Sequence, residues 1–123
     1  MLPEERDTAY LWDMLEAARS VAEFVGNRDR EEFLKPGMEE KILRLAVERK
    51  LEILGEAARR ISDGFRGNHP EVPWKEIVGL RNIISHQYDK VDYAEVYEIV
   101  RNRIPTLIEL IEPLVPPIPG EED

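Results

Sequence analysis

The sequence predicts an all-α protein, and two observations carry that prediction. Apolar residues recur at intervals of three and four over long stretches, which is the period of helices that bury one face. Glycine, asparagine and proline interrupt these stretches at a few points, so the helices are joined by short loops. We expect four main helices in an up-and-down four-helix bundle, with short additional helical turns.

The first helix is expected from about Glu5 to Val25, because apolar residues keep helical spacing up to that point. Gly26-Asn27 then ends it, as glycine and asparagine commonly do at helix C-termini. A short helical turn is expected at Arg30–Leu34, before Lys35-Pro36-Gly37 breaks the chain again.

The second helix, from Glu39 to about Ser62, is the longest and is apolar on two faces. One stripe contains Ile42, Leu45, Ala46, Ile53 and Ala57, and the other contains Leu43, Val47, Leu54, Ala58 and Ile61. Such a helix is either central to its bundle or carries a second interface. Gly55 costs up to about 1 kcal/mol in a helix interior relative to alanine. Close approach of another helix, in the same chain or in a partner, would explain it.

A polar loop is expected at residues 63–70, and the third helix should start near Pro73 or Trp74 because proline suits a first helical turn. The fourth helix opens at Asp92, which resembles an N-cap, and is expected to kink near Pro105. Residues 1–112 therefore form one helical domain, and residues 113–123 form a proline-rich, acidic C-terminal tail.

Composition excludes several classes of function. The chain has no cysteine, so disulfides, thiolate zinc sites and cysteine nucleophiles are ruled out. No apolar run approaches the roughly 18–20 residues needed to span a bilayer, and the first residues lack the features of a signal peptide. No membrane association is expected, and cytoplasm is the expected compartment.

The net charge of −9 argues against non-specific coating of nucleic acid, which needs a basic field. The charge is uneven, however, because residues 59–103 carry a slight excess of basic side chains and both flanking segments are acidic. Any site that handles an anion is therefore expected in the third quarter of the chain, although chance clustering would give the same distribution.

Candidate chemistry concentrates at the end of the third helix. Of the two histidines, His69 lies in the polar loop and is expected to be a solvated residue. His86 follows Arg81 by five residues and precedes Tyr88 by two. An imidazole can move a proton in phosphodiester cleavage, a guanidinium can stabilise phosphate charge, and a phenol can hydrogen-bond a phosphate or stack on a base. Asn82 and Ser85 could add hydrogen bonds.

Spacing alone leaves a structural interpretation open. Positions five apart lie about 140° apart around a helix, so Arg81 and His86 share no ideal face. An arginine at a helix end, a packed histidine and a half-buried tyrosine would produce the same pattern. The glutamates at 48, 52 and 56 are more typical of a solvated stripe than of a metal site. Glu56 could instead face Arg81 or His86 across the bundle.

The octapeptide from Arg81 to Tyr88 resembles the Arg-x4-His-x-Tyr motif of HepT-like proteins, which are toxins of the HEPN superfamily. Four other segments resemble the same family in the same order, and together they cover roughly residues 5–112. They are Arg6-Asp7 with Tyr10 to Leu15, Glu48 to Ala57, Val72 to Ile77, and Val91 to Tyr93.

The resemblance implies a HEPN-like helical bundle that forms a homodimer, with two motifs beside one another in a shared cleft. It implies a metal-independent endoribonuclease that cleaves tRNA or mRNA, needs no cofactor, and acts as the toxin of a type VII-like toxin–antitoxin pair. Arg81 would bind the scissile phosphate, His86 would act as general acid or base, and Asn82 would support the site. The expected partner is an MntA-like nucleotidyltransferase antitoxin, which inactivates the toxin by transferring AMP to Tyr88. Glu56 is a possible supporting residue.

Two other classes of function stay open. One is a catalytically silent HEPN module that binds and regulates a nucleotidyltransferase, because superfamily membership does not guarantee nuclease activity. The other is an oligomeric scaffold. The intact Arg81 and His86 pair favours the enzyme, whereas the acidity of the chain favours a binding module.

Overall fold

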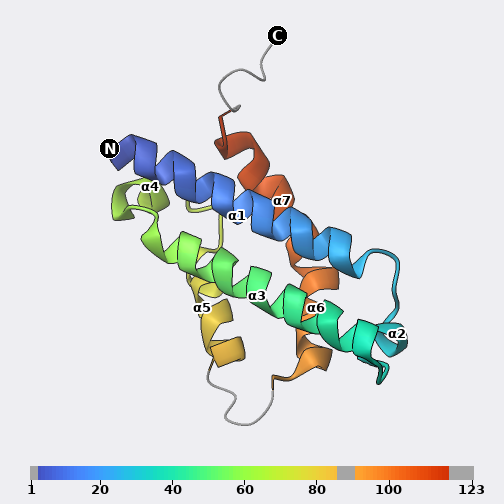
Figure 1. Ribbon diagram of the computed structural model, residues 1–123. Helices are drawn as coiled ribbons and strands as arrows, with labels where there is room; N and C mark the ends of the chain where they lie inside the picture. Colours follow the sequence, from blue (N-terminus) through green and yellow to red (C-terminus); the bar gives the residue numbers. More distant parts are fainter. Residues whose placement is uncertain (1–2, 86–90, 117–123) are drawn as a thin grey trace.

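The computed structural model describes residues 3–85 and 91–116, and within these residues every regular element is a helix (Figure 1). The predicted all-α class is therefore confirmed. No helix of this described part has both the length and the apolar character needed to cross a membrane.

The two longest helices, α1 (Pro3–Val25) and α3 (Met38–Arg60), lie side by side and run in opposite directions (Figure 1). Their facing sides form much of the core, because both carry apolar residues at helical spacing. Among the completely or almost completely buried side chains are Leu11, Met14, Leu15 and Val21 on α1, and Val47, Leu51, Leu54 and Ala58 on α3.

The other main helices complete the bundle. The third, α5 (Trp74–Ser85), packs on α3, and the fourth is divided into α6 (Tyr93–Asn102) and α7 (Ile104–Ile111), with α7 against α1. The division falls at Arg103, and Pro105 lies in the first turn of α7. The predicted kink near Pro105 is thus a break between two helices. A short 3-10 helix, η1 (Glu112–Leu114), follows.

The predicted N-cap of α6 is present, and α2 has a cap that was not predicted. The short α2 (Arg30–Leu34) has a complete capping box, in which Asp29 and Glu32 each accept a hydrogen bond from the backbone of the other. Asp92 caps α6 by accepting from the amides of Ala94 and Glu95, at 3.1 and 3.2 Å. These caps satisfy amides that a helix start leaves unpaired.

The expectation of a loop at residues 63–70 is wrong, because residues Asp63–Asn68 form a short helix, α4. The Ser62 hydroxyl accepts from the amide of Phe65 and caps this helix. Asp7 of α1 holds Ser62 in turn, accepting from its amide at 2.8 Å and its hydroxyl at 2.6 Å. A contact from a distant part of the chain thus supports a helix in a stretch whose composition favours turns.

Candidate active site

The buried residues of helix α5 fix the position of Arg81. Trp74, Ile77 and Leu80 are buried at helical spacing, and the indole Nε1 of Trp74 donates to the carbonyl of His69 at 2.9 Å. Arg81 comes one residue after the last of these positions and is exposed to solvent. Its backbone is therefore placed by the core, while its guanidinium can reach a ligand.

Gly55 allows α5 to approach α3 closely at Arg81. A Cβ added to Gly55 would lie 2.9 Å from Cγ of Arg81 and 3.2 Å from the carbonyl oxygen of Ile77. Both distances are shorter than ordinary van der Waals contacts, and one of the atoms belongs to the backbone. The predicted close approach at Gly55 is confirmed, and it is made by a helix of the same chain.

The guanidinium of Arg81 extends past Gly55 to the carboxylate of Glu56, with 3.2 Å between Nη1 and Oε2. The same carboxylate accepts from Arg59 at 2.8 Å and from Arg60 at 2.9 Å. Hydrogen bonds from Arg59 and Arg60, with the charge of Arg81, lower the pKa of Glu56 to about 2. The possibility that Glu56 faces Arg81 is thus borne out by the geometry.

These four residues, Glu56, Arg59, Arg60 and Arg81, form what we call the arginine cluster. Three guanidiniums share one carboxylate, so the cluster keeps an excess of positive charge on a chain whose net charge is −9. The side chain of Arg81 is 44% exposed. A guanidinium held on one side by a carboxylate and open on the other can bind a phosphate.

A second contact to α3 lies on the other side of residues 86–90. The hydroxyl of Tyr93, the first residue of α6, donates to Glu48 at 2.6 Å, and Arg44 stacks over the Tyr93 ring. Burial, followed by the bond to Glu48, raises the pKa of Tyr93 to about 12, so its hydroxyl stays protonated. Glu48 and Glu56 are about 12 Å apart along α3, given the helical rise. One helix therefore anchors the described chain on both sides of this segment.

The structure brings together only part of the predicted set. Arg81 and Glu56 are in contact, and Asn82 is exposed beside Arg81. His86 and Tyr88 lie outside the described residues. Arg59 and Arg60 were missed, although their positions three and four residues after Glu56 are those at which helical side chains pair.

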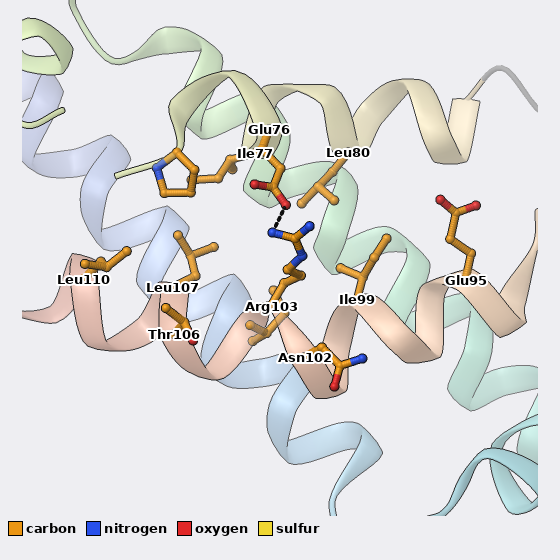
Figure 2. Close-up of a pocket in the computed structure, with 12 residues that line it drawn as sticks. Glu76, Ile77, Leu80, Glu95, Ile99, Asn102, Arg103, Thr106, Leu107 and Leu110 are labelled. Atoms are coloured by element: carbon orange, nitrogen blue, oxygen red, sulfur yellow. Dashed lines mark ion pairs between the residues drawn. The ribbon is translucent and has the colours of Figure 1, made fainter. Parts of the chain in front are cut away.

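A cavity of about 310 Å³ lies on a different side of α5, between this helix and α6–α7 (Figure 2). Its walls are mostly apolar, and an ion pair of 2.7 Å between Glu76 and Arg103 crosses it. Arg81 is not among the residues that line it. The arginine cluster and this cavity are therefore separate features.

The protein is an all-α bundle with Arg81 of the predicted motif exposed in the second half of α5. This arrangement agrees with the class that the sequence indicated, the HEPN-like ribonucleases. Comparison with known proteins identifies the family. The chain belongs to the family described as Ribonuclease HepT-like, which matches residues 14–114.

Similar proteins are found in archaea. One, named as a candidate RNase of Methanocaldococcus jannaschii, is 45% identical over 104 residues, covering 85% of this chain and 92% of the relative. A second candidate RNase of that organism is 34% identical over 99% of this chain and 98% of its own length. A candidate ribonuclease HepT of Thermococcus cleftensis is 38% identical over 80% of this chain and 86% of its own. No solved structure matches the chain.

Proposed function

We propose that this protein is a metal-independent endoribonuclease in which Arg81 and His86 carry out the cleavage. The observation that carries the proposal is the position of Arg81, which is anchored by Glu56 at 3.2 Å, packed over Gly55 and open to solvent. Its motif partner His86 lies five residues further along the chain. Membership of the HepT-like ribonuclease family supports the same reaction.

The proposed chemistry is attack of a ribose 2′-hydroxyl on the adjacent phosphorus. The imidazole of His86 removes the hydroxyl proton as general base, or protonates the leaving 5′-oxygen as general acid. Arg81 stabilises the charge that develops on the phosphate oxygens. The 5′-oxygen leaves with a proton, so the products are a 2′,3′-cyclic phosphate and a 5′-hydroxyl. Asn82 and Tyr88 contact the RNA beside the scissile phosphate.

The biological setting that we propose is a cytoplasmic toxin–antitoxin pair of the HepT/MntA type. The protein would act as a homodimer that cleaves tRNA or mRNA. An MntA-like nucleotidyltransferase would inactivate it by moving AMP from ATP to the hydroxyl of Tyr88, with release of pyrophosphate. The added phosphate would place a negative charge two residues after His86, where it would repel RNA.

Cleavage of a tRNA and mRNA mixture in EDTA tests the catalytic assignment. The wild type is compared with Arg81→Ala and His86→Ala, and folding of each variant is checked by circular dichroism. Arg19→Ala is the matched control, because this arginine is 49% exposed and pairs with one carboxylate, Glu112, at 3.0 Å. His69→Ala controls for the histidine.

EDTA-resistant cleavage that is lost in both motif variants and retained in both controls is the expected result. Equal cleavage by all five proteins would indicate a contaminating nuclease and refute the assignment. Absence of cleavage by the wild type, with retained binding to a nucleotidyltransferase, would favour the catalytically silent module.

The modification is tested separately by intact mass. The protein is incubated with an MntA-like nucleotidyltransferase and ATP, beside Tyr88→Phe and a control, Tyr93→Phe. We expect AMP-sized mass increments in the wild type and in Tyr93→Phe only. An increment that persists in Tyr88→Phe would exclude Tyr88 as the acceptor.

A further inference from the structure

The cavity beside α5 separates two parts of the bundle that are in little direct contact. Helix α5 packs closely on α3, whereas α6 and α7 pack on each other and on α1. The cavity fills about 310 Å³ between them, a volume that lies within the range of small-molecule sites. Its walls include the apolar side chains of Ile77, Leu80, Ile99 and Leu107. A small molecule in this cavity would therefore contact both parts of the bundle.

The charged side chains that line the cavity favour a cation. Among the described residues they are Glu76 on α5, Glu95 on α6 and Arg103 between α6 and α7. Glu76 and Arg103 form the ion pair of 2.7 Å. The carboxylate of Glu95 is exposed and has no ion pair or hydrogen bond within the described part of the chain. Two carboxylates against one guanidinium leave the cavity negative, so it attracts cations.

The ion pair that crosses the cavity can open at small cost. The side chains of Glu76 and Arg103 are 45% and 65% exposed, and exposed pairs of this kind contribute little because water screens them. Arg103 can therefore turn towards solvent and leave Glu76 to another cation. Both carboxylates of the cavity are then available to one ligand.

An apolar stretch separates these two carboxylates. Glu95, Ile99 and Arg103 follow one another at intervals of four residues, so Arg103 lies about 12 Å from Glu95 along the helix axis. Glu76 is at a similar distance from Glu95, because it contacts Arg103. Figure 2 shows Leu80 and Ile99 between the ion pair and Glu95. The cavity thus presents an acidic group, an apolar wall and a second acidic group in that order.

We propose that this cavity binds a linear aliphatic polyamine, with one terminal ammonium on Glu76 and the other on Glu95. Two ammonium groups joined by about eight methylenes lie about 11 Å apart when the chain is extended, which matches the spacing of the carboxylates. The methylenes pack on Leu80 and Ile99 and lose contact with water. An alkyl carboxylate fits less well, because it meets one guanidinium and two carboxylates. This proposal is independent of the proposed cleavage of RNA.

The bound ligand would connect α5 to α6, since Glu76 and Glu95 belong to these two helices. A ligand that binds only the folded protein raises its melting temperature. We expect spermidine, which has the required length, to raise the melting temperature by about 5 °C or more at about 100 times its dissociation constant. 1,3-Diaminopropane carries two charges that are only about 5 Å apart, so it cannot reach both carboxylates.

Calorimetric titration at low ionic strength tests the proposal directly. Spermidine is titrated into the wild type, Glu95→Gln, Arg103→Gln and a control, Glu109→Gln. Glu109 is exposed on α7 and does not line the cavity, so its substitution removes one negative charge elsewhere. All three substituted residues are exposed, so the variants should fold, which melting curves check.

The two cavity variants should change the affinity in opposite directions. Glu95→Gln should weaken spermidine binding about fivefold or more, because one end of the ligand loses its partner. Arg103→Gln should tighten binding, because Glu76 no longer has a competing guanidinium. Glu109→Gln should bind like the wild type. Equal losses in Glu95→Gln and Glu109→Gln would overturn the proposal, since they would indicate general attraction to an acidic chain. Unchanged or weaker binding by Arg103→Gln would overturn it as well.

The length and charge of the ligand provide the second test. 1,8-Diaminooctane should bind in the same range as spermidine, and 1,3-diaminopropane about tenfold more weakly or worse. Equal binding of the long and short diamines would refute a ligand that bridges Glu76 and Glu95. Absence of spermidine binding to the wild type would overturn the proposal. Binding of octanoate that Arg103→Gln abolishes would also overturn it, by assigning the cavity to an anion. RNA cleavage enters none of these measurements, so a failure of the proposed reaction leaves them interpretable.

Discussion

Asp7 and Glu56 are two carboxylates that connect separate parts of this bundle in different ways. Asp7 is buried, with 8% exposure, and its partners are the amide and hydroxyl of Ser62. Glu56 is about one third exposed, and its partners are three guanidiniums. Asp7 joins α1 to the junction of α3 and α4, whereas Glu56 joins α3 to α5.

These two environments give the carboxylates different roles: Asp7 supports the fold, and Glu56 supports the proposed site. A buried carboxylate bonded to uncharged donors stabilises the fold, and its loss leaves those donors unsatisfied. A solvent-exposed carboxylate among arginines contributes little stability, since water and salt screen such pairs. Glu56 instead orients the guanidinium of Arg81, and it leaves an excess of positive charge facing solvent. We therefore expect changes near Asp7 to alter stability and changes near Glu56 to alter activity.

The largest effect is expected from Arg81→Lys. Lysine keeps the charge but loses the forked geometry that binds phosphate and Glu56 at the same time. We predict a loss of RNA cleavage of about 100-fold or more, with a melting temperature close to that of the wild type. Arg19→Lys should cleave normally. Unchanged cleavage by Arg81→Lys would show that only charge matters at this position.

A large loss of stability is expected from Asp7→Ala, which removes both bonds to Ser62. Hydrogen bonds to a charged group contribute about 1.5–3 kcal/mol, so we predict a decrease of about 3 kcal/mol in the free energy of unfolding. Urea denaturation measures it. Asp13→Ala, an exposed position on the same helix, is the control and should stay near the wild type. Similar losses in both variants would contradict the architectural role of Asp7.

A moderate effect is expected from Gly55→Ala. The added methyl group would press on Arg81 and on the backbone of Ile77, and overpacking of this kind costs about 1–3 kcal/mol. The better helix propensity of alanine offsets up to about 1 kcal/mol of that. We predict a net loss of about 1 kcal/mol, together with reduced cleavage as Arg81 shifts.

Gly79→Ala is the matched control for this substitution. Gly79 lies inside α5, and a Cβ there would meet nothing within 4 Å. This variant should be as stable as the wild type or slightly more stable, by up to about 1 kcal/mol. Equal stability of the two alanine variants would mean that α5 does not press on Gly55.

The smallest effect is the pH dependence contributed by Glu56. Its pKa falls from an ordinary value of 4.5 to about 2 in the folded protein, because Arg59, Arg60 and Arg81 favour the charged form. This contribution to stability is present above about pH 4.5 and is lost as the pH falls towards 2. Denaturation of wild type and Glu56→Gln across this range should show a slightly steeper acid loss in the wild type. Parallel curves would contradict the lowered pKa.

Most of the fold could be predicted from the sequence because it depends on local patterns. Apolar spacing located the main helices, and proline, glycine and aspartate marked their ends. Helix α4 was missed because Gly64 and Gly67 favour turns, while the support for this helix comes from Asp7, more than fifty residues earlier. A contact between distant residues leaves no periodic signal in the sequence.

The site was predicted only in part, again because contacts between distant residues leave no periodic signal in the sequence. Arg81 was identified from its spacing to His86 and from the family motif, and Gly55 from its cost within a helix. The sharing of Glu56 among three arginines depends on how α5 crosses α3, which residue spacing does not determine. The exposed face of α3 was also ambiguous, because its two apolar stripes look alike until the core is known.

Glu56→Gln and Asp7→Asn, measured side by side, test the central claim most directly. Cleavage of RNA in EDTA is expressed per folded molecule, and the free energy of unfolding is measured on the same samples. We predict that Glu56→Gln lowers the cleavage rate about tenfold through loss of orientation with little change in stability. Asp7→Asn should lose stability and keep its rate per folded molecule. If Glu56→Gln cleaved like the wild type while Asp7→Asn lost its rate, the assignment of function to the arginine cluster would be contradicted.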